Sequence, residues 1–255
     1  MARFKRLEVY NTIIDTGLVP VFYNADINVA KNVVKACTDG GATVVEFTNR
    51  GDFAPEVFKE LSQHLSTQSP EVILGVGSVI DEPTAALYIA YGANFVVGPL
   101  LNEAVARLCN RRKVAYMPGC GSVSEISYAE ELGMEIVKIF PGDSVGGPNF
   151  VKAVLGPAHG RELCLPVESM PLKKALKPGS GQVWHVWASA QTSSARIWSP
   201  PAAGPRSQKR CSRSWHGSRK HAKGCFLGRQ RPEIWSSQKR FKSVADTLEK
   251  SLTFS

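Results

Sequence analysis

Lys138 is the residue of this 255-residue chain whose surroundings point most directly to chemistry. It lies inside Ile136-Val137-Lys138-Ile139-Phe140-Pro141, an apolar run in which a charged ammonium would be costly to bury. Burial favours the neutral amine, and a neutral amine can attack a ketone to form a protonated imine. Such an imine accepts electrons, so that a carbon–carbon bond one atom away can break. The alternative is a lysine at a strand edge whose amine reaches solvent.

Glu46 could move the protons that this chemistry needs. It lies in Val44-Val45-Glu46-Phe47-Thr48, and burial there favours the protonated carboxyl, which can act as general acid and base. The alternative is a glutamate that lines the fold and pairs with a cation such as Lys138. Arg50 follows four residues later, and its planar guanidinium suits a substrate carboxylate. A solvent-exposed loop arginine would have the same spacing.

Short apolar runs and helical stretches must position these residues. Nearly continuous hydrophobicity over a few residues is typical of strands buried on both faces of a parallel sheet. The predicted strands are Val19–Phe22, Val44–Thr48, Val72–Gly77, Phe95–Val97, Val114–Met117 and Ile136–Phe140. Between them, helical spacing predicts helices over Ile27–Cys37, Phe53–Leu65, Glu82–Tyr91, Asn102–Cys109 and Ser124–Leu132. Gly92 and Gly133 follow the last turns of two of these helices, where a left-handed cap favours glycine.

Six strands alternating with helices describe either a doubly wound sheet or most of a (β/α)8 barrel. No GxGxxG follows the first strand, which argues against the dinucleotide-binding sheet. Polar residues instead follow several strands, as Arg50 and Ser78 do, and in a barrel the carboxyl ends of the strands form the active site. We therefore expect an α/β protein of the (β/α)8 type.

Other sequence features exclude several classes of function. No run of about 18 apolar residues could span a membrane, the N-terminus is too polar for a signal peptide, and the cysteines lack zinc spacing. We expect a cytoplasmic, reduced protein without a metal site. Cys37, Cys109 and Cys120 are interpreted as core thiols. The run Gly75-Val76-Gly77-Ser78 predicts a close backbone approach and one useful hydroxyl.

The chain has two unlike halves. Residues 1–157 hold 13 Lys and Arg against 17 Asp and Glu, whereas residues 158–255 hold 18 against 5. The formal net charge of +9 therefore comes from the second stretch, which also holds all five tryptophans. We expect a barrel over 1–157 and a basic segment, rich in Trp, Ser and Arg and poorly ordered, over 158–255.

Five ordered motifs in the first stretch resemble one enzyme family. They are Val45-Glu46-Phe47-Thr48-Asn49-Arg50, Gly75-Val76-Gly77-Ser78, Phe95-Val96-Val97-Gly98-Pro99, Met117-Pro118-Gly119 and Val137-Lys138-Ile139-Phe140-Pro141. They resemble the bacterial 2-dehydro-3-deoxy-phosphogluconate / 4-hydroxy-2-oxoglutarate aldolases, class I lyases on a (β/α)8 barrel. The resemblance covers residues 1–157.

The resemblance implies a role for each candidate residue. Lys138 would form the Schiff base and Glu46 would transfer protons, while Phe140 would lie beside the imine. Arg50, Ser78 and Pro99 would line the pyruvate end of the substrate, with Ser78 standing where the family usually has threonine.

The implied reaction cleaves 2-dehydro-3-deoxy-6-phosphogluconate to pyruvate and glyceraldehyde 3-phosphate, or 4-hydroxy-2-oxoglutarate to pyruvate and glyoxylate. It would use a covalent imine on Lys138 and no metal or other cofactor. Family members are typically trimers, so a homotrimer is implied.

The family pattern stops after Leu155-Gly156-Pro157. A seventh strand ending in Pro-Thr-Gly-Gly and an eighth ending near Gly-Ser would follow, and their glycines and serine would bind phosphate; neither motif is present. Read one base out of frame, Cys164–Ser169 permits Pro-(Thr or Ser)-Gly-Gly-Val. In the same frame, Pro178–Ala188 permits a helix end that runs into the eighth strand, and Gln208–His221 permits an amphipathic helix. We hypothesise a one-base frame change near codon 157, and expect weak or no activity on phosphorylated substrate.

Two other interpretations remain open. In the first, the chain is a catalytically dead barrel remnant, whose first and sixth strands would have unpaired edges, one of which Val183–Trp187 could cover. In the second, the basic stretch Arg210–Lys223, with Trp215, binds single-stranded nucleic acid. We expect no specific nucleic-acid binding, because no element is predicted to present these charges.

Overall fold

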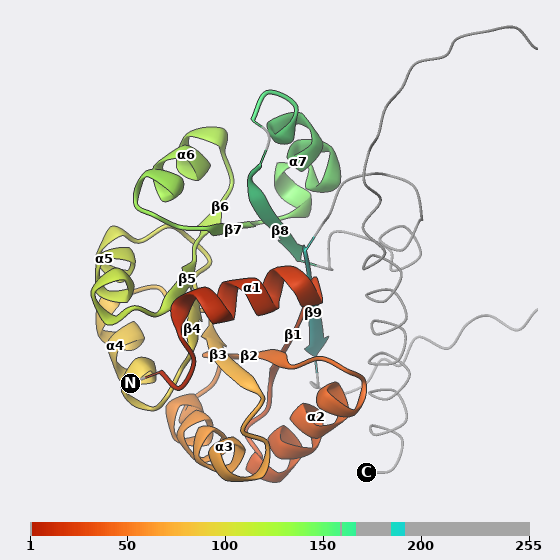
Figure 1. Ribbon diagram of the computed structural model, residues 1–255, viewed down its shortest axis with the longest axis vertical. Helices are drawn as coiled ribbons and strands as arrows, with labels where there is room; N and C mark the ends of the chain where they lie inside the picture. The colour runs from red at the N-terminus through yellow and green to blue at the C-terminus, as the bar shows by residue number, and fades with distance from the viewer. Residues whose placement is uncertain (1, 159, 167–184, 192–255) are drawn as a thin grey trace, which may run out of the picture.

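The computed structural model describes residues 2–158 and 160–166 in full and residues 185–191 as backbone. A ring of parallel strands is surrounded by helices (Figure 1). The strands are β1 (Leu18–Tyr23), β2 (Val44–Thr48), β3 (Ile73–Gly77), β4 (Phe95–Val97), β5 (Ala115–Met117), β6 (Gly119–Cys120), β7 (Ile136–Ile139), β8 (Glu162–Pro166) and β9 (His185–Gln191).

The order of the strands closes the sheet into a barrel. The order is β5-β4-β3-β2-β1-β9-β8-β7-β6, and Pro118 alone separates β5 from β6. Strands β5 and β6 are thus one chain segment that occupies both ends of the order. Counted as one strand, this segment and the seven other described strands fill eight barrel positions. The barrel that the sequence predicts is confirmed.

Helices follow the strands and cover the outside of the barrel. They are α1 (Arg6–Thr16), α2 (Ile27–Asp39), α3 (Ala54–Gln68), α4 (Glu82–Ala90), α5 (Glu103–Arg112), α6 (Val123–Glu131) and α7 (Gly147–Leu155), with a short 3-10 helix at Asp143–Val145. The side chains of Asp26, Asp81, Asn102 and Ser122 cap four of them by accepting bonds from the first backbone N–H groups. Gly92 and Gly133 adopt the left-handed conformation expected of them, with φ of 99° and 80°.

The six predicted strands and five predicted helices are present, with ends that differ by at most three residues. The structure also contains α1 and α7, two helices that were not predicted from the sequence. Helix α1 lies across the ring of strands (Figure 1), and its Val9, Tyr10 and Ile13 pack with the inward side chains of the strands. One end of the barrel is thereby closed with apolar side chains.

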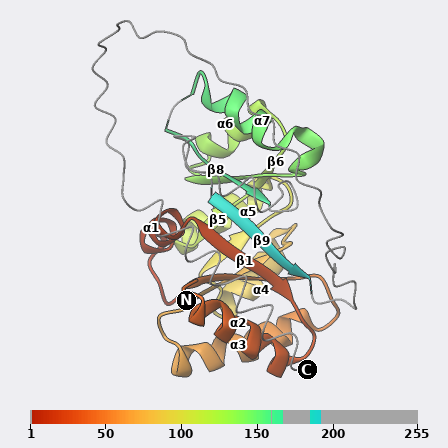
Figure 2. The same cartoon turned by 90° about the vertical axis from the view of Figure 1, so that its right-hand side faces the viewer.

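The expectation of unpaired edges is wrong. Strand β9 pairs with both β1 and β8, and β8 pairs with β7, in parallel register throughout (Figure 2). The physical reason is that strand pairing needs backbone groups and an apolar run, not the family's glycine motif. Leu163, Cys164 and Leu165 supply such a run in β8 and are at most 3% exposed.

Residues 167–184 and 192–255 lie outside the described part, and with them the basic stretch 210–223 and most of the 158–255 segment. Among the described residues, no helix combines the length and the apolarity needed to cross a bilayer.

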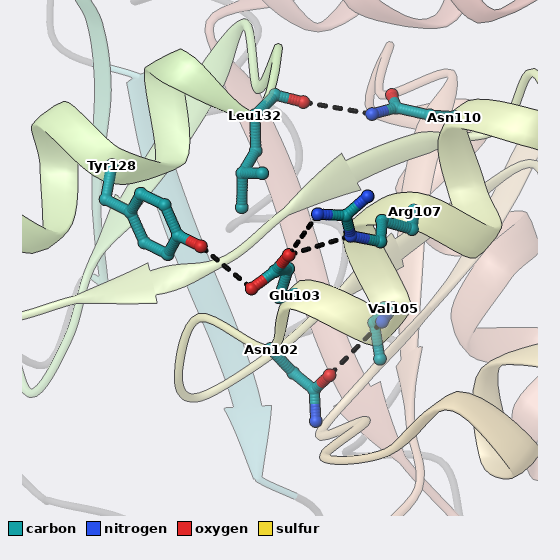
Figure 3. Close-up of polar contacts among 7 residues, drawn as sticks. All are labelled: Asn102, Glu103, Val105, Arg107, Asn110, Tyr128 and Leu132. Atoms are coloured by element: carbon teal, nitrogen blue, oxygen red, sulfur yellow. Dashed lines mark hydrogen bonds and ion pairs between the residues drawn. The ribbon is translucent and has the colours of Figure 1, made fainter.

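Side-chain hydrogen bonds join neighbouring helices on the outside of the barrel, and they join helix α1 to a strand on the inside. On the outside, Tyr128 Oη of α6 donates to Glu103 Oε2 of α5 at 2.8 Å, and Arg107 contacts the same carboxylate (Figure 3). Inside, the buried Tyr10 Oη accepts from Tyr116 N at 3.1 Å and donates to Tyr116 O at 3.2 Å. One hydroxyl of α1 thus satisfies both backbone groups of a barrel residue.

Tyr10→Phe should lower the free energy of unfolding by about 2 kcal/mol, because it leaves a buried backbone donor and acceptor without this partner. Urea denaturation monitored by circular dichroism measures the change. The matched control is Tyr128→Phe, which removes an exposed hydroxyl and should cost less than about 1 kcal/mol. Equal losses for the two variants would contradict this account of the closed end.

Candidate active site

Glu46 of β2 and Lys138 of β7 both face the interior of the barrel. Alternate residues of a strand share a face, and Val44 and Ile136, two residues earlier, belong to the interior apolar cluster. Glu46 is 1% exposed, whereas Lys138 is partly exposed. The two ionisable groups that the sequence singled out therefore share one interior.

Cys164 of β8 links these two residues. Its Cα is the register partner of Lys138, and its fully buried thiol lies 3.6 Å from Val137 O. Burial raises the pKa of the Cys164 thiol to about 12, while the nearby Lys138 lowers this pKa and Glu46 raises it. The Lys138 amine and the Glu46 carboxyl group thus both lie within electrostatic range of this one thiol.

Gly77, the last residue of β3, makes room for the Glu46 carboxylate. A methyl group at Gly77 would overlap Glu46 Oε1, and one at Gly75 would overlap the ring of Phe95. The close backbone approach predicted for Gly75-Val76-Gly77 is thus observed. The glycines of β3 let a charged group and an aromatic ring fill the interior beside that strand.

Arg50 and Ser78 meet at the carboxyl ends of β2 and β3. Arg50 Nε donates to Ser78 Oγ at 3.2 Å, and Asn49 N donates to Gly77 O at 2.9 Å. Ser78 adopts a left-handed conformation with φ of 62°. The loop after β2 is therefore fastened across the end of β3, with an exposed guanidinium beside a hydroxyl.

Phe140 lies next to Lys138, and Pro99 lies against Gly119, the residue paired with Lys138 in the neighbouring strand. Lys138 Nζ is 5.5 Å from the centroid of the Phe140 ring, a cation–π distance. Gly119 is the register partner of Lys138, and a methyl group at Gly119 would overlap the backbone of Pro99. All six residues singled out in the sequence thus lie at or near the carboxyl ends of barrel strands, as the (β/α)8 fold requires of an active site.

The sequence analysis missed Cys164 and Tyr23. Cys164 falls in the segment interpreted as out of frame, although the apolar run Leu163–Leu165 could have indicated a strand. Tyr23 ends β1, and its hydroxyl lies where a methyl group at Gly51 would be. Cys37, Cys109 and Cys120 are buried, and burial raises the pKa of each thiol to about 12, as expected of core cysteines. In the described part of the chain, no group of three or more His, Cys, Asp or Glu residues could hold a metal ion.

A family model described as KDPG and KHG aldolase matches residues 9–167. This chain belongs to the KDPG and KHG aldolase family. The match continues ten residues beyond 157, the boundary expected from the motifs, and includes β8. Strands β1 to β8, with Glu46, Arg50, Ser78, Pro99, Lys138 and Phe140, lie within the matched residues, whereas β9 lies beyond them.

Relatives and solved structures of this aldolase family agree with the assignment. A 2-dehydro-3-deoxy-phosphogluconate aldolase of Pseudoalteromonas atlantica is 32% identical over 147 residues, which are 58% of this chain and 66% of that protein. A KHG/KDPG aldolase of Escherichia coli K12 is 29% identical over 154 residues, or 60% and 70% of the two chains. The chain thus spans about two thirds of these relatives.

Two crystal structures share the barrel. The 2-keto-3-deoxy-6-phosphogluconate aldolase of Zymomonas mobilis gives a TM-score of 0.63 at 22% identity, covering 71% of this chain and 84% of that one. The KDPG aldolase of Legionella pneumophila, with pyruvate captured as a covalent carbinolamine, gives 0.60 at 21% identity, covering 70% and 84%. At these identities the similarity establishes the fold.

Gly77→Ala should lower the free energy of unfolding by about 1 to 3 kcal/mol, because the new methyl group forces the Glu46 carboxylate out of its place. Gly156→Ala, at the end of α7, is the matched control. Its backbone is helical and its methyl group would make ordinary contacts, so it should be neutral or slightly stabilising. Urea denaturation measures the free energy of unfolding of both variants. A Gly77→Ala variant as stable as the parent would contradict the placement of Glu46.

Proposed function

We propose that this protein is a class I aldolase that cleaves a 4-hydroxy-2-oxo acid and releases pyruvate. The observation that carries the proposal is the placement of Lys138 and Glu46 in one barrel interior, linked through the Cys164 thiol. The candidate substrates are 2-dehydro-3-deoxy-6-phosphogluconate and 4-hydroxy-2-oxoglutarate. The names of the relatives and the carbinolamine of the Legionella protein support this choice.

The chemistry begins at the Lys138 amine. Its unprotonated nitrogen attacks the C2 carbonyl of the 2-oxo acid to give a carbinolamine, which loses water and becomes a protonated imine. Glu46 takes the proton of the C4 hydroxyl, the C3–C4 bond breaks, and its electron pair enters the imine to form an enamine. The aldehyde leaves. Glu46 then returns a proton to C3, and water releases pyruvate and restores the amine.

The protonated imine is the electron acceptor of this sequence, so the proposed reaction needs neither a metal ion nor an organic cofactor. Glu46 suits the proton transfers because its side chain is buried in the same barrel interior as the reacting amine. Phe140, next to the ammonium, and Pro99, above Gly119, would form the walls around the imine.

Arg50 and Ser78 would bind the substrate carboxylate. A guanidinium can pair with a carboxylate through two hydrogen bonds, and the neighbouring hydroxyl can donate a third. The carboxylate would be held at the mouth of the barrel while its C2 carbonyl reaches Lys138. The arrangement selects 2-oxo acids over simple ketones.

The phosphate end of the substrate is a separate part of the proposal. Where the family's glycine motif would follow β8, this chain has Val167-Glu168-Ser169. A one-base frame change near codon 157 would explain the absence of that motif. A homotrimer acting in the cytoplasm belongs to the same proposal and rests on the family resemblance alone.

Borohydride reduction in the presence of pyruvate should add a stable pyruvyl group to Lys138, because hydride reduces the imine to a secondary amine. Mass spectrometry of the peptide that contains Lys138 measures the adduct. Lys138→Arg should abolish it, since a guanidinium does not form the imine. Lys152→Arg, an exposed lysine of α7, is the control and should leave the adduct unchanged. A parent protein without an adduct would identify a dead barrel remnant instead.

The 255-residue protein should cleave 4-hydroxy-2-oxoglutarate but turn over the phosphorylated sugar acid poorly. Each lost charge-assisted phosphate contact costs about 1.5 to 3 kcal/mol, so kcat/KM for the phosphorylated substrate should rise at least about 100-fold when the codons after 157 are read in the alternative frame. Coupled assays of pyruvate release on both versions measure this ratio. No gain on frame repair would refute the frame hypothesis.

A further inference from the structure

The loop that carries Arg50 is fixed on both sides by residues that the proposed reaction does not use. Asn49 precedes Arg50 and Gly51 follows it. Asn49 is bound through its side chain by Tyr88 of α4 and through its backbone by Gly77 of β3. Gly51 packs against the hydroxyl of Tyr23 at the end of β1. The position of the guanidinium therefore depends on contacts outside the barrel interior.

Tyr88 is the most constrained member of this set. It is 0% exposed, and its hydroxyl donates to Asn49 Oδ1 at 2.9 Å. Its ring ends a row of aromatic contacts, with centroids 5.0 Å apart in the edge-to-face pair of Phe58 and Tyr88 and 6.1 Å apart in the tilted pair of Phe47 and Phe58. The row fills the space between β2 and helices α3 and α4. The ring cannot move without disturbing this layer, so its hydroxyl has a fixed place.

The environment of Tyr88 keeps its hydroxyl a proton donor. Burial raises the pKa of the Tyr88 phenol, and the nearby groups of Glu56 and Tyr23 raise it further. The hydroxyl stays protonated throughout the neutral pH range. Leaving a buried donor without its acceptor is unfavourable, which favours the loop conformation that brings Asn49 to it.

Asn49 transmits this constraint to the active site. Its backbone N–H donates to Gly77 O, the residue beside the Glu46 carboxylate, and Arg50 N donates to Thr48 O at 3.0 Å. Arg50 Nε then reaches Ser78 Oγ. A chain of hydrogen-bonded residues thus runs from helix α4 through Asn49 to the guanidinium.

We propose that Tyr88 and Asn49 are positioning residues that hold Arg50 in the conformation that binds the carboxylate of the 2-oxo acid. The inference rests on the proposed aldolase function for its substrate and on the hydrogen bonds above for its geometry. Neither residue contacts the reacting atoms. Their loss weakens carboxylate binding and leaves the chemistry at Lys138 intact.

Tyr88→Phe tests the inference because it removes one hydroxyl and keeps the ring. The pyruvate concentration that gives half-maximal borohydride trapping should rise about fivefold, the equivalent of one neutral hydrogen bond of about 1 kcal/mol. The trapping rate at saturating pyruvate should stay within about twofold. Asn49→Ala should raise the half-saturating pyruvate concentration by a similar factor. The double variant should not raise this concentration further than Asn49→Ala alone. Tyr91→Phe, at the end of the same helix, is the control and should match the parent.

A second measurement needs no catalysis. Phenylglyoxal modifies exposed arginines, and the rate of its reaction with Arg50, followed by mass spectrometry of that peptide, should rise in Tyr88→Phe and Asn49→Ala and not in Tyr91→Phe. Unchanged half-saturation and unchanged Arg50 reactivity would overturn the positioning role. A parent protein without any pyruvate adduct would instead refute the proposed function, and the Arg50 reactivity would still decide the inference.

Discussion

A carboxylate enclosed in an apolar barrel is the constraint on which the rest of the site depends. Glu46 is 1% exposed, and a buried charge is costly unless polar or charged groups surround it. Lys138 places its amine in the same interior, Cys164 adds a buried thiol whose pKa is raised to about 12, and Gly77 provides the space. Each of these residues comes from a different strand, so the arrangement exists only when the sheet is closed.

The closure of the barrel separates a structural end from a reactive end. At the amino ends of the strands, Val9, Tyr10 and Ile13 of α1 fill the interior, and the Tyr10 hydroxyl satisfies the backbone of Tyr116. At the carboxyl ends, loops carry Arg50 and Ser78 outward. This division is the general one for (β/α)8 barrels, in which one face provides stability and the other provides chemistry.

The sequence was sufficient to predict the elements whose apolar runs are continuous. The barrel interpretation also brought Glu46 and Lys138 toward one site, because side chains near the carboxyl ends of different barrel strands converge. It was insufficient for β8 and β9. These strands were not expected, because the family's glycine motif is missing there, although strand pairing needs only backbone groups and apolar side chains. Helix α1 was missed because its apolar residues form a narrow stripe between charged ones. The contact of Tyr88 with Asn49 joins residues 39 positions apart, and no local spacing reports it.

The exchange of the methyl protons of pyruvate in deuterated water tests the central pairing of Lys138 and Glu46 most directly. The imine on Lys138 becomes an enamine only when Glu46 removes a proton from C3. Return of a deuteron then replaces that proton, so the methyl signal of pyruvate in a proton NMR spectrum should disappear with the parent protein. Glu46→Gln should form the imine, as borohydride detects, but should exchange the methyl protons at least about 100-fold more slowly. Exchange at the parent rate in Glu46→Gln would contradict the assignment of Glu46 as the group that moves the proton.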